Sequence, residues 1–131
     1  MLRVHDTQIR VRYQETDGQG RVHHANYLTY LETARTELLR DNGTPYQELE
    51  AEGVMLVVAD ARCRYRGPAF YDDLLIVRTY VDKTKGARIF IRYEIFRGED
   101  IIFDGNTTLA CISIDGAVRR LPDVLRIQVE D

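Results

Sequence analysis

The sequence predicts an α+β protein in which a curved antiparallel sheet of about five strands wraps around one long central helix. Residues 27–39 carry apolar side chains at helical spacing, one strand-like segment precedes them, and about four follow. The strand segments are separated by short turns, which favours antiparallel neighbours. Such a sheet must pack against an apolar surface, and the helix offers the only sizeable one.

The first strand is predicted from Gln8 onward, because apolar and polar residues alternate there. The next segment, residues 15–24, is predicted to be a loop in which Gly18 and Gly20 permit unusual backbone angles. The apolar side of the strand holds Ile9, Val11 and Tyr13.

Two helices follow. Asn26 is the predicted N-cap of the long helix, and Asn42-Gly43 is its predicted stop. Thr44 and Gln47 fit a capping box for a second, short helix, with Pro45 at its first position. The apolar stripe of the long helix comprises Tyr27, Leu28, Tyr30, Leu31, Ala34, Leu38 and Leu39.

The remainder of the chain is predicted to be strand. The four runs cover residues 54–66, 74–82, 88–97 and 101–114, with hairpin-type connections between them. Gly105, inside the last run, is predicted to mark a β-bulge.

Residues 1–131 are predicted to form a single domain, since a chain of this length buries ~65–70% of its unfolded surface. No apolar run approaches the ~20 residues that span a bilayer, so no membrane insertion is expected. The N-terminus lacks the apolar core of a signal peptide. A cytoplasmic location is therefore expected.

The charge is uneven. The net charge is −3, which argues against nucleic acid as a partner. Residues 62–97 nevertheless hold nine Lys or Arg and four acids, a local +5 against −8 elsewhere. This stretch is either a solvated basic face or a site for a small anionic ligand. Cys63 and Cys111 fit no metal motif and are expected to be reduced core residues, with a catalytic thiol as the weaker alternative.

The loop before the long helix is the candidate site. Asp17 lies there, followed by His23 and His24 and then the helix start. Helix N-termini present unpaired N–H groups and a partial positive charge, which can hold an oxyanion. A thioester suits so sparse a site, because its thiolate leaves without a strong general acid. One carboxylate, a water and an oxyanion donor would be enough.

Other interpretations of the loop remain open. Asp17 could be a simple turn residue. Asp17, His23 and His24 could ligate zinc, although adjacent histidines seldom face one ion, so no metal is expected. Glu32 or Glu37, on the helix, could act in place of Asp17.

These residues resemble the signature of the 4-hydroxybenzoyl-CoA thioesterase family. Within it, the sequence is most similar to the branch of small acyl-CoA thioesterases associated with the Tol-Pal system. The resemblance covers nearly the whole chain, and its loop motif is the most specific part. The matching runs are Tyr13-Gln14-Glu15-Thr16-Asp17, His24-Ala25-Asn26-Tyr27-Leu28, Glu32-Thr33-Ala34-Arg35, Tyr65-Arg66-Gly67-Pro68-Ala69, Asp115-Gly116 and Leu121-Pro122.

The resemblance implies the hotdog fold, with active sites at a dimer interface and dimers that often pair into tetramers. It places Asp17 at the catalytic aspartate, as nucleophile or general base. It places His24 at a functional position whose backbone N–H polarises the thioester carbonyl, and Tyr13 at a supporting tyrosine. His23 departs from the family pattern, so the resemblance leaves open which histidine faces the site.

The expected function is hydrolysis of an acyl-CoA, without a cofactor, by a homo-oligomer, dimer or tetramer. Tyr27 is a candidate for the substrate pocket. The CoA phosphates would meet Arg64, Arg66, Lys85 and Arg88 in the basic stretch. A non-hydrolytic acyl-CoA binder or partner protein is the alternative of another class, and a hydratase or dehydratase on the same fold is a third.

Overall fold

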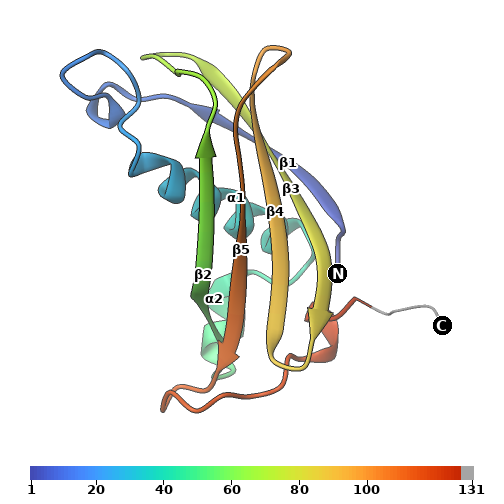
Figure 1. Ribbon diagram of the computed structural model, residues 1–131. Helices are drawn as coiled ribbons and strands as arrows, with labels where there is room; N and C mark the ends of the chain where they lie inside the picture. The colour runs from blue at the N-terminus through green and yellow to red at the C-terminus, as the bar shows by residue number, and fades with distance from the viewer. Residues whose placement is uncertain (128–131) are drawn as a thin grey trace.

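The computed structural model describes residues 1–127. It contains five strands, two α-helices and two short 3₁₀ turns (Figure 1). In chain order these are β1 (Val4–Arg10), η1 (Tyr13–Glu15), α1 (Asn26–Asp41), α2 (Tyr46–Ala51), β2 (Met55–Tyr65), β3 (Leu74–Lys85), β4 (Arg88–Arg97), β5 (Asp100–Ile112) and η2 (Asp123–Leu125).

The strands form one antiparallel sheet in the order β1-β3-β4-β5-β2. Helix α1 crosses behind this curved sheet, and α2 lies at the lower end of β2 (Figure 1). The arrangement confirms the predicted architecture of a sheet around one long helix. It also leaves β2 at one edge, with a single described neighbour, β5.

The prediction that all late strands follow one another as hairpins is wrong for β2 and β3. These two strands lie at separate positions, because β2 pairs with β5 along its whole length. The chain from Arg66 to Asp73 therefore crosses one end of the sheet (Figure 1). Turn signals alone do not say which strands pair.

Several element boundaries differ from prediction. β1 ends at Arg10, because the amide of Val11 already donates to the carbonyl of Asp73 (2.9 Å) in a connecting loop. Helix α1 begins at Asn26 itself. The side chain of Asn26 does not cap the helix, because its Nδ2 donates to the backbone carbonyl of Glu15 (2.8 Å). The prediction of a capping box for α2 is wrong, because the hydroxyl of Thr44 donates to the backbone carbonyl of Leu39 in α1 (3.3 Å).

Gly105 is not at a bulge. It lies in register opposite Cys63 of β2 and Tyr93 of β4, and the register shifts of the sheet fall elsewhere. A Cβ at this position would collide with the carbonyl of Arg62 and approach the ring of Phe103 to 3.1 Å. The glycine is needed for close backbone packing rather than for a bulge.

The core lies between α1 and the inner face of the sheet. Alternate residues of β3 and β4 point inward and are buried, together with one side of α1. β2 differs, because most of its side chains are exposed or only partly buried. The buried residues of α1 are Tyr27, Tyr30, Leu31, Ala34, Leu38 and Leu39, and the prediction that Leu28 belongs to this stripe is wrong, since it is exposed.

Two further sequence expectations concern the cysteines and the membrane. Cys111 is buried and Cys63 partly buried, and both are free thiols in the described chain. Burial raises the pKa of the Cys111 thiol, which disfavours the reactive thiolate. Among the described residues, no helix is long and apolar enough to cross a membrane.

Candidate active site

The loop between β1 and α1 is held to the helix by Glu15, whose residue is 7% exposed. Its carboxylate accepts hydrogen bonds from the hydroxyl of Tyr30 and the amide of Arg12, both at 2.8 Å, and from Arg12 Nε at 3.0 Å. Its carbonyl accepts from the amide of His23 (2.9 Å) and from Asn26 Nδ2 (2.8 Å). Glu15 therefore ties both arms of the loop to the first turns of α1.

The electrostatics of this contact favour an ionised carboxylate. Burial by itself would raise the pKa of Glu15, but the hydrogen bonds from Arg12 and Tyr30 and the Arg12 charge outweigh it. The pKa of Glu15 consequently lies below its ordinary value. The pKa of Tyr30 is raised, first by burial and then by its hydrogen bond to Glu15, so the tyrosine remains a donor.

Asp17 lies at the turn of the loop and is partly exposed. Its Oδ1 accepts from the amides of Gln19 (2.8 Å) and Arg21 (3.3 Å). Its own amide donates to the carbonyl of Arg21 (2.7 Å), which closes the turn. Its Oδ2 has no hydrogen-bond partner within residues 1–127. One carboxylate oxygen thus fixes the turn while the other faces outward.

The two histidines have different environments, although their rings stack with centroids 4.2 Å apart. His23 Nδ1 accepts from the amide of Ala25 (3.1 Å), which uses this ring in the local turn. The ring of His24 lies edge-on to Tyr65, with centroids 6.3 Å apart. The backbone amide of His24 donates no hydrogen bond in the described chain, in contrast to the amides of His23 and Ala25.

Tyr65, at the end of β2, attaches the sheet to the helix start. Its hydroxyl donates to the carbonyl of His24 (3.2 Å). Its ring packs edge-on against Tyr27 and Phe103, which stack on each other with centroids 5.3 Å apart. This aromatic cluster contacts the start of α1 through the carbonyl of His24.

Two further predicted site residues, Tyr13 and Tyr27, differ sharply in exposure. Tyr13 is 76% exposed and its ring contacts Tyr71 edge-on, with centroids 5.5 Å apart. Tyr27 is 3% exposed and belongs to the core in this structure. Burial raises the pKa of Tyr27, as expected for a packed phenol. Asp17 and His24 lie on the same β1–α1 loop, while the Tyr13 ring is exposed and Tyr27 is part of the core.

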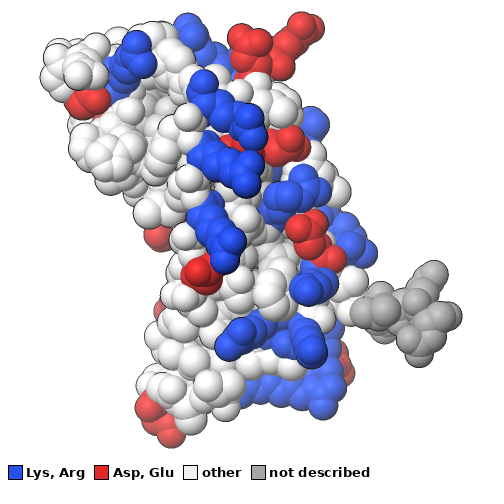
Figure 2. Space-filling view, in the orientation of Figure 1, with Lys and Arg blue, Asp and Glu red and all other residues white. Residues whose placement is uncertain are grey.

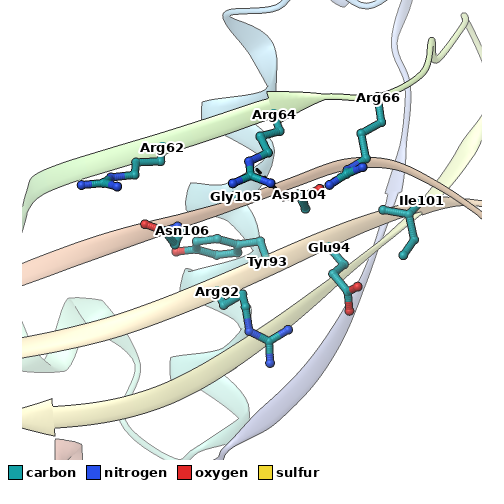
Figure 3. Close-up of a pocket in the computed structure, with 10 residues that line it drawn as sticks. All are labelled: Arg62, Arg64, Arg66, Arg92, Tyr93, Glu94, Ile101, Asp104, Gly105 and Asn106. Atoms are coloured by element: carbon teal, nitrogen blue, oxygen red, sulfur yellow. Dashed lines mark hydrogen bonds and ion pairs between the residues drawn. The ribbon is translucent and has the colours of Figure 1, made fainter.

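The basic stretch forms rows on the outer face of the sheet, the face turned away from α1 (Figure 2). A groove of about 670 Å³ crosses this face, with arginines of β2 along one wall and β4 along the other (Figure 3). Its lining comprises Arg62, Arg64, Arg66, Arg92, Tyr93, Glu94, Ile101, Asp104, Gly105 and Asn106.

The structure separates the four predicted phosphate ligands into two pairs. Arg64 and Arg66 line the groove, and both contact Asp104, Arg64 at 4.0 Å and Arg66 in a closer ion pair. Lys85 and Arg88 lie at the β3–β4 turn. Glu94 of β4 lies opposite Asp104 of β5, and Arg88 is six residues from Glu94 along β4. At ~3.3 Å per residue, roughly 20 Å of strand therefore separates Arg88 from the arginines that contact Asp104.

Sequence reasoning missed two contacts that shape the site. Glu15 was only part of a motif, and nothing local indicates that Tyr30, 15 residues later, donates to it. Tyr65 was likewise only part of a motif, and its contact with His24 spans 41 residues. No group of three or more His, Cys, Asp or Glu that could hold a metal ion occurs among residues 1–127.

Comparisons with known proteins identify the family and agree with the fold. The family model described as "Thioesterase superfamily" matches residues 19–103. A "putative esterase" of Aquifex aeolicus is 37% identical over 90% of this chain and 92% of its own. The "acyl-CoA thioesterase YbgC" of Haemophilus influenzae is 37% identical over 81% of this chain and 79% of its own. The solved DHNA-CoA thioesterase of Staphylococcus aureus superimposes with a TM-score of 0.87, at 34% identity, over 90% of this chain and 80% of that one.

A hotdog-fold enzyme is the class that this sheet, helix and loop define. The chain belongs to the thioesterase superfamily. Membership of an enzyme family favours catalysis over the alternative of a non-hydrolytic binding protein.

Proposed function

We propose that the protein hydrolyses acyl-CoA thioesters, with Asp17 as the reacting carboxylate and the amide of His24 as the oxyanion donor. The observation that carries the proposal is the pair of free groups on one loop. Asp17 Oδ2 and the His24 N–H both lack a hydrogen-bond partner in the described chain, at the start of α1. The printed names of relatives in Haemophilus influenzae and Bacillus subtilis, both acyl-CoA thioesterases, support the substrate class.

The chemistry follows from the two groups. As a general base, Asp17 takes a proton from a water whose oxygen then bonds to the thioester carbonyl carbon. The His24 N–H hydrogen-bonds the resulting oxyanion. Collapse breaks the C–S bond, and the departing thiolate takes up a proton, so the products are a free acid and CoA. As a nucleophile, Asp17 Oδ2 would itself bond to the carbonyl carbon, the C–S bond would break to release the CoA thiolate, and water would then cleave the mixed anhydride to the free acid and the Asp17 carboxylate.

The neighbouring side chains support these roles. Hydrogen bonds from Gln19 and Arg21 to Oδ1 orient the carboxylate, so that Oδ2 is the oxygen presented to a substrate. His24 is favoured over His23 as the histidine at the site, since His23 Nδ1 already accepts from Ala25. Tyr13 supports the site by holding the turn, because its carbonyl accepts from the hydroxyl of Thr16 (2.7 Å). The buried Tyr27 would act as the pocket wall behind the helix start.

Arg64 and Arg66 are the proposed contacts for the CoA phosphates. They flank Tyr65, which touches His24, at the same end of β2, and their side chains line the groove on the outer face of the sheet. Both contact Asp104 on an exposed face, where an ion pair contributes only ~0–1 kcal/mol. A phosphate that accepts two guanidinium hydrogen bonds can compete with such a pair.

A homo-oligomer with active sites between subunits is the proposed assembly. The edge of β2 that faces away from β5 is unpaired over its 11 residues in the described chain, and Val57, Val58 and Tyr65 on this strand are exposed apolar side chains. Natural proteins rarely leave such an edge uncovered. Antiparallel pairing of two β2 edges would place Lys85 and Arg88 of a second copy near the loop. Sedimentation should give a dimer or tetramer, and an active monomer at working concentration would rule this assembly out.

A finer assignment concerns the branch of the superfamily and the cellular location. We place the chain in the branch of small acyl-CoA thioesterases associated with the Tol-Pal system, acting in the cytoplasm, where acyl-CoA is made and used. The support is the loop motif and the YbgC name of the Haemophilus influenzae relative.

A panel of acyl-CoA thioesters tests the function. Purified protein is incubated with short, long, branched and aromatic acyl-CoAs, and thiol release is followed with a thiol-reactive dye. We expect release above background for at least one member and none for the Asp17→Asn variant. If the wild-type protein binds acyl-CoA but releases no thiol from any member of the panel, the proposed thioesterase activity is wrong.

A further inference from the structure

The two arms of the β1–α1 loop pair with each other as a short antiparallel ladder. The amide of His23 donates to the carbonyl of Glu15 (2.9 Å), and the amide of Asp17 donates to the carbonyl of Arg21 (2.7 Å). Between these two bonds the arms form one isolated antiparallel bridge. The ladder therefore holds the arm that carries Asp17 against the arm that leads into α1.

Glu15 attaches this ladder to α1. Asn26 Nδ2 donates to the backbone carbonyl of Glu15, and the hydroxyl of Tyr30 donates to its Oε1, both at 2.8 Å. Asn26 and Tyr30 are four residues apart, so they lie on the same side of the helix in successive turns. Helix α1 thus holds Glu15 at two points, one on its backbone and one on its side chain.

The carboxylate of Glu15 is not itself available to a substrate. The residue is 7% exposed, and both of its carboxylate oxygens already accept hydrogen bonds. Oε1 accepts from Tyr30 and from the amide of Arg12, and Oε2 accepts from Arg12 Nε. Glu15 is therefore a fixed acceptor that holds its donors in place, in contrast to Asp17, whose Oδ2 is unpaired within residues 1–127.

Both reacting groups of the proposed mechanism lie next to a point that Glu15 fixes. Asp17 follows Glu15 by two residues on the same arm, and His24 directly follows His23, whose amide donates to the Glu15 carbonyl. Attack on a thioester requires the carboxylate and the oxyanion donor to meet one carbonyl group together. A shift of about 1 Å in such an arrangement can lower the rate by about 10²-fold.

We propose that Glu15 and Tyr30 are positioning residues for the thioesterase reaction. The Tyr30 hydroxyl fixes the Glu15 carboxylate, and Glu15 in turn sets the position of Asp17 relative to the amide of His24. Both residues act on the chemical step and not on substrate binding. The inference rests on the proposed thioesterase function and adds to it two residues that lie 15 positions apart in the chain.

Removal of one hydroxyl tests the proposal. Tyr30→Phe deletes the donor to Glu15 and keeps the aromatic ring in the core. We expect kcat to fall by about tenfold while KM stays within about twofold of wild type, because the groups that bind substrate are unchanged and only their alignment is lost. Steady-state kinetics on the best thioester of the panel measures both constants.

Tyr80→Phe is the matched control. The hydroxyl of Tyr80 also donates to a glutamate, Glu94 Oε1 (2.6 Å), but this pair lies on the outer face of the sheet. Tyr80→Phe should leave kcat and KM unchanged. Both variants are assayed well below their Tm, so that unfolding does not appear as a lower kcat. Equal kcat in the two variants, or a change confined to KM in Tyr30→Phe, would overturn the proposal.

A double-mutant cycle tests whether Tyr30 acts through Glu15. Glu15→Met removes the acceptor and should lower kcat by about 10²-fold at a similar KM. Adding Tyr30→Phe to Glu15→Met should then lower kcat no further, because the hydroxyl has already lost its partner. Additive losses would overturn the assignment. Tyr30→Phe and its control decide the proposal by themselves where Glu15→Met is too unstable to purify.

Failure of the thioesterase function itself would give a different result. The wild-type protein would then release no thiol, or Asp17→Asn would retain full activity. Failure of the positioning role leaves an active enzyme that depends on Asp17 and in which Tyr30→Phe has the kcat of wild type.

Discussion

The two carboxylate oxygens of Asp17, in the β1–α1 loop, have different environments. One carboxylate oxygen of Asp17 closes the turn through Gln19 and Arg21, and the other is free. The turn role and the catalytic role are therefore compatible in one side chain. The turn role needs only an acceptor oxygen at this position, and Oδ2 is the oxygen that we propose reacts with a substrate.

Asp17→Asn should lower kcat by about 10²–10⁴-fold, because the amide keeps the turn but lacks basicity and charge. KM should change little, since the His24 amide and the arginines are untouched. Steady-state kinetics on the best thioester of the panel measures this. Glu99→Gln, in the exposed β4–β5 turn, is the control. If Asp17→Asn stays within a few-fold of wild type while Glu32→Gln is inactive, the chemistry belongs to the helix.

Glu15 should make the free energy of unfolding depend on pH in the acidic range. Its pKa is lowered in the folded state, so its contribution is fully present above its unfolded pKa and is lost as pH falls through the folded one. Glu15→Gln should reduce the free energy of unfolding by about 1–3 kcal/mol at neutral pH. The difference from wild type should shrink toward pH 3.

Denaturant unfolding at a series of pH values measures this effect. Glu99→Gln, in the exposed β4–β5 turn, is the control and should leave the pH profile unchanged. A constant difference between Glu15→Gln and wild type from pH 7 to pH 3 would contradict the ionised role of Glu15.

At the scale of elements, the sheet depends on close contact between β5 and its neighbours. Gly105→Ala should destabilise the protein by about 1–3 kcal/mol, because the added Cβ meets the Arg62 carbonyl and the Phe103 ring. Thermal unfolding compares it with Gly18→Ala, whose Cβ would meet nothing within 4 Å. Equal effects of the two substitutions would mean that β5 shifts to make room.

Across the whole molecule, the outer basic rows should make substrate binding sensitive to salt. Higher ionic strength should raise KM more than it lowers kcat, since exposed charges are screened. Replacing Arg64 and Arg66 together with Ala should raise KM several-fold at low salt, and replacing Lys85 and Arg88 should raise it less. Arg40→Ala, on α1, is the control. A fall in kcat at constant KM would place these residues in another role.

The sequence alone was sufficient for the features that depend on local periodicity. It predicted α1, the strands, and a loop with a carboxylate between β1 and α1, because apolar spacing and turn residues act over a few neighbouring positions. It could not predict that β2 pairs with β5 at one edge, or that Tyr30 and Tyr65 secure the loop from 15 and 41 residues away. It also grouped Arg64, Arg66, Lys85 and Arg88, which β2 and the β3–β4 turn hold at opposite ends of the sheet. Strand order and side-chain networks depend on contacts between distant segments, which form only when the sheet closes over α1. The tertiary structure therefore decided which of the predicted residues lie at the same end of the sheet.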